Sequence, residues 1–158
     1  MCGIYGVMGF NGSFLPEHNT LQSMAETLSH RGPDGHDIYI DNECALGHKR
    51  LSIIDLVNGA QPMGTEDGRW WITYNGEIYN YKQIRSELET SGETFKTTSD
   101  TEVVLKGLAI YGPDFLSKLN GIFALALWDH SKKSLLLARD HLGIKPIYFA
   151  NNGTHFVF

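Results

Sequence analysis

The sequence is poor in the features that mark several large classes of protein. Its two cysteines, Cys2 and Cys44, are too few for a disulfide framework. No apolar run is long enough to span a bilayer, and no basic segment followed by an apolar one marks a secretory signal. Lysine and arginine total 13 against 18 acidic residues, and the net charge is −5 without a basic cluster. This balance argues against nucleic acid or a membrane as partner, and we expect a cytoplasmic protein.

Common catalytic and nucleotide-binding motifs are missing as well. The seven histidines form no HExxH pattern and no Cys/His pair at zinc spacing, so no metal site is expected. No serine lies in a G-x-S-x-G turn, and no G-x-x-x-x-G-K-[ST] loop is there to hold a nucleoside triphosphate. These absences remove zinc enzymes, serine hydrolases and P-loop enzymes from consideration.

What is there describes one domain, with 158 residues of which 42% are hydrophobic. Hydrophobic periodicity and capping residues predict three helices, at about 16–29, 80–91 and 99–111. Alternating or continuous apolar runs predict strands at 3–9, 37–41, 44–54, 69–74, 94–97, 121–128, 134–138 and a last hairpin over 147–158. Asn75-Gly76 is interpreted as a hairpin turn after the strand at 69–74. The order predicts an α+β fold of layered, mainly antiparallel sheets covered by helices.

Cys2 is the candidate nucleophile. Removal of Met1 would make it N-terminal, so that one residue carries both a thiol and an α-amine able to accept its proton. The alternative is a small buried residue at the start of a strand, which describes most lone cysteines. Position alone therefore does not decide between the two readings.

A cysteine nucleophile needs an oxyanion hole and a substrate clamp. Asn75 and Gly76 offer a side-chain amide and an unhindered backbone N–H, although such pairs are more often plain turns. Arg50, on a predicted strand, can hold a carboxylate through two parallel hydrogen bonds, or it can simply face water. Glu77 and Asp100 can hold an ammonium group, and Asp100 can equally serve the first turn of a helix. Together these residues would recognise an α-amino acid.

Six motifs, in order, carry a resemblance to a known family. They are Cys2-Gly3-Ile4, His30-Arg31-Gly32-Pro33-Asp34, His48-Lys49-Arg50-Leu51-Ser52-Ile53-Ile54-Asp55, Tyr74-Asn75-Gly76-Glu77-Ile78-Tyr79-Asn80, Ser99-Asp100-Thr101-Glu102 and Ala138-Arg139-Asp140-His141-Leu142-Gly143. The chain resembles, nearly end to end, the glutaminase domain of glutamine-hydrolysing asparagine synthetases. These are class II glutamine amidotransferases of the N-terminal-nucleophile (Ntn) hydrolase fold, a four-layer αββα sandwich.

The resemblance implies that Cys2 attacks glutamine, forming a γ-glutamyl thioester, and that water then releases glutamate. It implies an oxyanion hole at Asn75 and Gly76. The positions that it assigns to glutamine binding are Arg50, Leu51, Ser52, Ile53, Ile54, Asn75, Gly76, Glu77 and Asp100. No cofactor is expected in this chain, since ATP and magnesium would belong to a synthetase domain that makes asparagine from aspartate.

That synthetase domain is absent from residues 1–158, and the ending Phe156-Val157-Phe158 suggests truncation of the glutaminase fold itself. Residues 1–158 are thus predicted to be one glutaminase domain, with glutamine as substrate and the missing domain as partner. Two alternatives stay open: a non-catalytic glutamine-binding or interaction fragment, and an amidotransferase of the same family with another ammonia acceptor. The oligomeric state also stays open.

Overall fold

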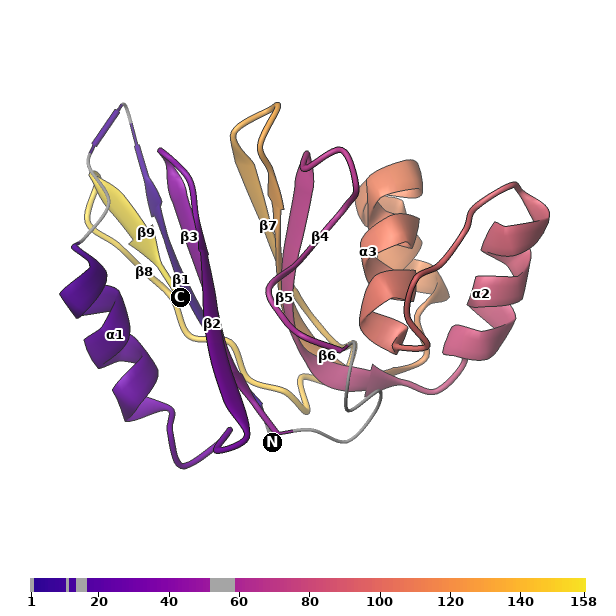
Figure 1. The fold of residues 1–158 in the computed structure, drawn as a ribbon, viewed down its shortest axis with the longest axis horizontal. Coiled ribbons are helices and arrows are strands. Elements are labelled where there is room, and N and C mark those ends of the chain that lie inside the picture. Colours follow the sequence, from indigo (N-terminus) through magenta and orange to yellow (C-terminus); the bar gives the residue numbers. More distant parts are fainter. Residues whose placement is uncertain (1, 11, 14–16, 52–58) are drawn as a thin grey trace.

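The computed structural model describes residues 2–10, 12–13, 17–51 and 59–158, and it is built in four layers (Figure 1). Helix α1 (His18–Thr27) covers a five-stranded sheet, which faces a four-stranded sheet. Helices α2 (Tyr81–Thr90) and α3 (Asp100–Tyr111) cover the far side of the second sheet. The arrangement confirms the predicted α+β sandwich.

Every strand pair in both sheets of the described chain is antiparallel. The five-stranded sheet has the order β2 (Gly35–Ile40), β3 (Cys44–Arg50), β1 (Gly3–Gly9), β9 (His155–Val157), β8 (Ala150–Asn151). The four-stranded sheet has the order β4 (Met63–Gly64), β5 (Trp70–Ile78), β6 (Gly121–Asp129), β7 (Ser134–Arg139). A 3₁₀ helix, η1 (Gly112–Lys118), joins α3 to β6.

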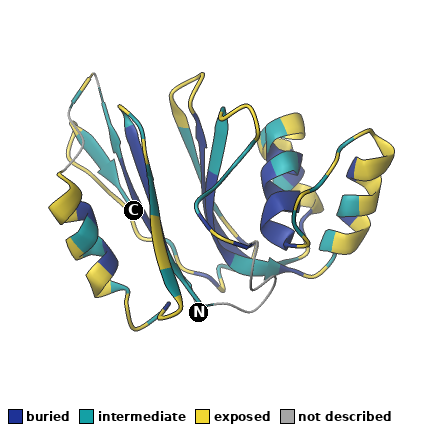
Figure 2. Ribbon diagram, in the orientation of Figure 1, coloured by how far each residue is buried: buried dark blue, intermediate teal, exposed yellow. Residues whose placement is uncertain are grey.

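Three apolar clusters hold the layers together, and Figure 2 shows buried residues along the strands of both sheets and on the side of α3 that faces its sheet. The largest lies between the four-stranded sheet and its two helices, because α3 turns Val103, Val104 and Leu108 inward. The indole of Trp128 is fully buried between the sheets. No helix in the described part of the chain is long and apolar enough to cross a membrane.

Most predicted elements are confirmed. β1 has the predicted bounds, and α3 ends at Gly112, whose φ of 67° suits glycine. Ser99 caps α3 by accepting a hydrogen bond from the Glu102 N–H, which is one half of a capping box, whereas the Glu102 carboxylate accepts from the Lys96 and Thr97 N–H groups and not from that of Ser99. The strand predicted at 94–97 is wrong, because that stretch forms no strand. The strand predicted at 44–54 ends at Arg50, and its positions 52–54 lie outside the described residues.

The hairpin turn predicted at Asn75-Gly76 is also wrong. β5 runs without interruption from Trp70 to Ile78 and pairs along its whole length with β6. A Cβ on Gly76 would lie 2.4 Å from the Ile122 carbonyl oxygen and 2.7 Å from the Phe123 Cα. Glycine is therefore needed here for close approach of two strands and not for a turn.

Candidate active site around Cys2

Cys2 lies just before β1, where it meets the end of β3. The Leu51 N–H donates to the Cys2 sulfur at 3.3 Å, and the thiol lies 3.5 Å from the Leu51 carbonyl oxygen. The guanidinium of Arg31, in the loop after α1, donates to the Cys2 carbonyl at 3.2 Å. These contacts hold the half-buried Cys2 between the start of β1 and the end of β3.

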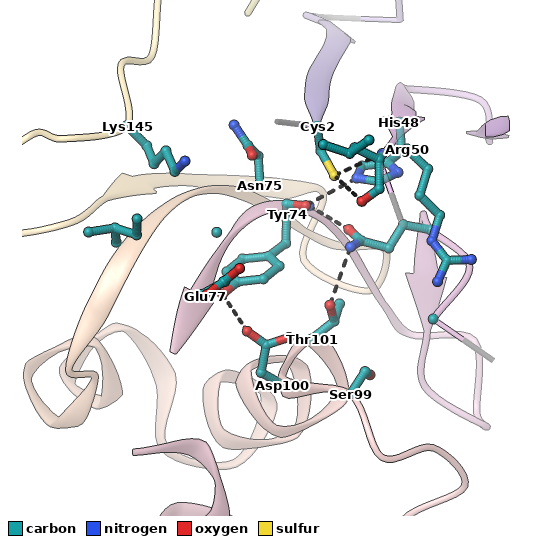
Figure 3. A pocket seen from close by; sticks show the side chains of 15 residues that line it. Cys2, His48, Arg50, Tyr74, Asn75, Glu77, Ser99, Asp100, Thr101 and Lys145 are labelled. Atoms are coloured by element: carbon teal, nitrogen blue, oxygen red, sulfur yellow. Dashed lines mark hydrogen bonds between the residues drawn. The ribbon is translucent and has the colours of Figure 1, made fainter. Parts of the chain in front are cut away.

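A cavity of about 190 Å³ opens beside the thiol (Figure 3). It is lined by all the predicted site residues that the structure describes, namely Cys2, Arg50, Leu51, Asn75, Gly76, Glu77 and Asp100. Ser52, Ile53 and Ile54, also predicted to bind glutamine, lie outside the described residues. The volume is below the roughly 300–1,000 Å³ of sites for drug-sized ligands, so it suits a small molecule.

Three parts of the fold meet at this cavity. Cys2 and Arg50 come from the five-stranded sheet, Asn75 to Glu77 come from β5 of the other sheet, and Asp100 is the first residue of α3. Figure 3 shows Arg50 on one side of the cavity and the carboxylates of Glu77 and Asp100 on the other. An arginine and two carboxylates around one small cavity are complementary to an α-amino acid, which carries both a carboxylate and an ammonium group.

The geometry of β5 determines where the Gly76 N–H points. Successive residues of an antiparallel strand turn their peptide groups alternately toward one edge and the other. Phe123, opposite Gly76 on β6, bonds to Asp140 through both its N–H and its carbonyl, and Tyr74 also bonds away from β6. Gly76 therefore directs its N–H away from β6, to the edge of β5 that borders the cavity. An N–H in this position can serve an oxyanion.

Asp100 is almost fully buried, and one of its oxygens is already engaged. Its Oδ2 accepts from the Tyr74 hydroxyl at 2.7 Å and from the Ile78 N–H at 3.0 Å. Burial raises the pKa of Asp100 above its usual value, although these hydrogen bonds oppose the shift. Asp100 thus supports β5 from the helix side, and its predicted role toward a substrate amine stays a prediction.

Sequence reasoning missed several residues that line the cavity. Burial lowers the pKa of His48 to about 4, so its ring is neutral, and Nε2 donates to the Tyr74 carbonyl at 3.2 Å. Its Nδ1 is the one buried side-chain nitrogen or oxygen in the described chain that has no hydrogen-bond partner. Gln61 accepts from the Tyr74 N–H at 2.7 Å. His48 stood in the motif at 48–55 without an assigned role, and Gln61 gave no signal.

Lys145 also lines the cavity, and the loop that carries it is held by Asp140. The Asp140 carboxylate accepts four backbone N–H groups, from Phe123, Leu142, Ile144 and Lys145. These bonds give the polar stretch after β7 a structural role. Figure 3 places the Lys145 side chain near Asn75, at the opposite side of the view from Arg50.

A second, larger cavity of about 550 Å³ shares Cys2 and Asn75 with the first. Its walls are mainly apolar and come from α1, β1 and the chain after Pro146, including Ile4, Met24, Leu28, Ile147, Tyr148 and Phe158. Within the described residues, no cluster of three or more His, Cys, Asp or Glu side chains could hold a metal ion.

Comparison with known proteins links the whole chain to one family. A family model described as "Glutamine amidotransferase domain" matches residues 1–158. Asparagine synthetase [glutamine-hydrolyzing] 3 of Bacillus subtilis (strain 168) is 41% identical over 160 residues, covering 100% of this chain and 26% of that protein. Asparagine synthetase B [glutamine-hydrolyzing] of Escherichia coli (strain K12) is 40% identical over 148 residues, covering 94% of this chain and 26% of that protein. The chain thus spans about a quarter of the length of these relatives.

A solved structure shares the fold. The glutamine phosphoribosylpyrophosphate (PRPP) amidotransferase from B. subtilis, complexed with ADP and GMP, matches with a TM-score of 0.79 at 20% sequence identity. The match covers 98% of this chain and 40% of that one. At this identity the likeness concerns the fold, which is Ntn-like with two antiparallel sheets between helices.

Proposed function

Because the chain belongs to the family of glutamine amidotransferase domains, we propose that it hydrolyses glutamine to glutamate and ammonia through a thioester on Cys2. The observation that carries the proposal is the meeting of a thiol, an outward-facing Gly76 N–H and oppositely charged side chains in one small cavity. Each of these groups has a defined task in amide hydrolysis.

In the first half of the reaction, the freed α-amine of Cys2 takes the thiol proton, and the sulfur attacks the side-chain carbonyl carbon of glutamine. The Gly76 N–H and the Asn75 amide donate to the resulting oxyanion. The carbon–nitrogen bond then breaks, and the protonated α-amine returns its proton to the leaving ammonia. A γ-glutamyl thioester remains on Cys2.

In the second half, water attacks the thioester while the α-amine accepts a proton from it, and glutamate leaves as the thiol is restored. Arg50 holds the substrate carboxylate through two parallel hydrogen bonds. Glu77 holds the substrate ammonium, and Asp100 adds negative charge beside it. An ammonium there lowers the pKa of Asp100 again and favours its charged form.

The ammonia passes, in this proposal, to a synthetase region that makes asparagine from aspartate and ATP, as the names of the curated relatives suggest. The glutaminase step itself requires no cofactor from this chain. A free thiol nucleophile suits a reducing cytoplasm. An acceptor other than aspartate would leave every glutaminase step unchanged.

The proposal is tested by glutamine hydrolysis in the chain with Met1 removed and in Cys2→Ala. We expect Cys2→Ala to reduce turnover by roughly 1,000-fold or more, since the substitution removes the nucleophile and leaves the α-amine with no thiol to activate. A glutamine-like electrophile should add to Cys2, and intact mass reports both this addition and the loss of Met1.

Cys44 supplies a matched control. It is the other free cysteine, fully buried, and burial raises the pKa of its thiol. Cys44→Ala should keep turnover and labelling. Labelling at Cys44, or full turnover in Cys2→Ala, would contradict the proposal. Glutamine binding without turnover in the wild-type chain would favour a non-catalytic module instead.

A further inference from the structure

Among the described residues, the edge of β5 that borders the cavity is only partly covered by a neighbouring strand. On its other edge β5 pairs with β6 throughout, whereas β4 pairs only with Trp71 and Ile72. An uncovered strand edge presents N–H and carbonyl groups that need partners when they are buried. From Tyr74 onward, side chains from other parts of the fold supply these partners.

The N–H and the carbonyl of Tyr74 both have a side-chain hydrogen-bond partner at this edge. Gln61 Oε1 accepts from the Tyr74 N–H at 2.7 Å, and His48 Nε2 donates to the Tyr74 carbonyl at 3.2 Å. A single acceptor and a single donor thus take the place of a strand residue opposite Tyr74. Both side chains are buried, so water does not compete strongly for these groups.

Ile78, further along the same edge of β5, is supported in the same way. The Ile78 N–H, four residues beyond Tyr74, donates to the Asp100 carboxylate at 3.0 Å. Gly76 lies midway between these two supported residues, and its N–H faces the same edge by the alternation of the strand. The strand is therefore held at Tyr74 and at Ile78, on both sides of the Gly76 N–H that borders the cavity.

Gln61 and His48 connect this edge to the rest of the site. The Gln61 amide donates to the Thr101 hydroxyl at 3.3 Å, in the first turn of α3 next to Asp100. His48 belongs to β3, two residues before Arg50, and so reaches from one sheet to the other. Figure 3 shows the hydrogen bond between His48 and Tyr74 beside the cavity.

We propose that Gln61 and His48 are positioning residues of the oxyanion hole, which replace a strand neighbour along Tyr74 and so hold the Gly76 N–H in place toward Cys2. The inference rests on the proposed glutaminase function. Tyr74 and Asn75 share a peptide unit, so a shift of the Tyr74 carbonyl moves the strand at Asn75 and Gly76. Misplacement by about 1 Å can cost about 100-fold in rate, so even a partial loss of support has a measurable effect.

Gln61→Met tests the inference because methionine matches the length of glutamine and lacks the amide. We expect kcat per labelled Cys2 to fall about 10-fold, while KM for glutamine changes less than about twofold. Gln61→Glu keeps an acceptor for the Tyr74 N–H and should recover most of the lost kcat. Gln83, exposed on α2, gives the matched control, and Gln83→Met should leave both constants unchanged.

His48 provides a second, independent pair of variants should Gln61→Met fold poorly. His48→Leu removes the donor to the Tyr74 carbonyl and should lower kcat as Gln61→Met does. His48→Gln places an amide N–H close to the position of Nε2 and should restore kcat. Counting only sites labelled by the electrophile removes the effect of unfolded molecules, so a purely structural role would leave kcat per labelled site unchanged.

The outcomes separate the inference from the proposed function. Wild-type chain without glutaminase turnover would overturn the proposed function, and the positioning role with it. Active wild type, with kcat per labelled site unchanged in both Gln61→Met and His48→Leu, would overturn the positioning role alone. A higher KM at unchanged kcat would also overturn it, because that result would make these side chains substrate contacts.

Discussion

Cys2 and Asn75 line two cavities that differ in the ligands they can hold. The smaller cavity is bordered by the guanidinium of Arg50 and the carboxylates of Glu77 and Asp100, whereas the larger one is walled mainly by aliphatic and aromatic side chains. A charged amino acid loses its hydration on entering either cavity, and only the smaller one offers charges of both signs, since the larger one has Arg31 but no carboxylate among its described lining residues. The larger volume therefore does not identify the substrate site here. The side chains that can pair with the charged groups of an amino acid identify it.

Asn75 borders both cavities, and its substitution is expected to have the largest effect on turnover of those that compare the two cavities. Asn75→Ala should lower kcat about 100- to 1,000-fold with little change in KM, because the amide is proposed to act on the oxyanion and not on bound glutamine. Steady-state hydrolysis measures both constants. Asn19→Ala, on the exposed surface of α1, is the control. A raised KM at normal kcat would assign Asn75 to substrate binding.

The sequence predicted the cavity better than it predicted the local structure of its parts. Asn75 and Gly76 were assigned to the site and do line it, yet they lie inside a continuous strand and not in a turn. Local propensity favours a turn for this pair, but pairing with β6 overrides that preference. The error did not affect the prediction of the site residues, because the resemblance rests on the order of residues along the chain and not on their secondary structure.

Gln61 could not have been predicted in the same way. Its role depends on the short length of β4, which pairs with Trp71 and Ile72 but does not reach Tyr74 on that edge of β5, and on the approach of α3 to β5. Such contacts join residues 13 and 40 positions apart and arise only when the layers have assembled. Composition and periodicity carry no signal for a glutamine that completes a strand edge.

Arg50→Lys examines the charged side of the smaller cavity. An ammonium cannot make two parallel hydrogen bonds to a carboxylate, so KM for glutamine should rise about 10-fold while kcat changes little. The conservative change at Arg139→Lys, at the exposed end of β7, should leave KM unchanged. An unaltered KM in Arg50→Lys would remove this residue from the substrate clamp.

The smallest effect is expected at Met24, which lines the apolar cavity but not the smaller one. It packs against the cluster of Val7, Leu21 and Ala45. Met24→Gln preserves length and adds a polar amide to that wall. If glutamine occupies only the smaller cavity, kcat and KM should both stay within about twofold of the wild-type values. The free energy of unfolding should fall by about 1 kcal/mol, because a partly buried thioether is replaced by an amide that lacks an evident partner. Urea unfolding and steady-state hydrolysis measured on the same sample separate the two effects. A KM increase of several-fold with unchanged stability would mean that the substrate extends past Cys2 into the apolar cavity, and the division of roles between the two cavities would then be wrong.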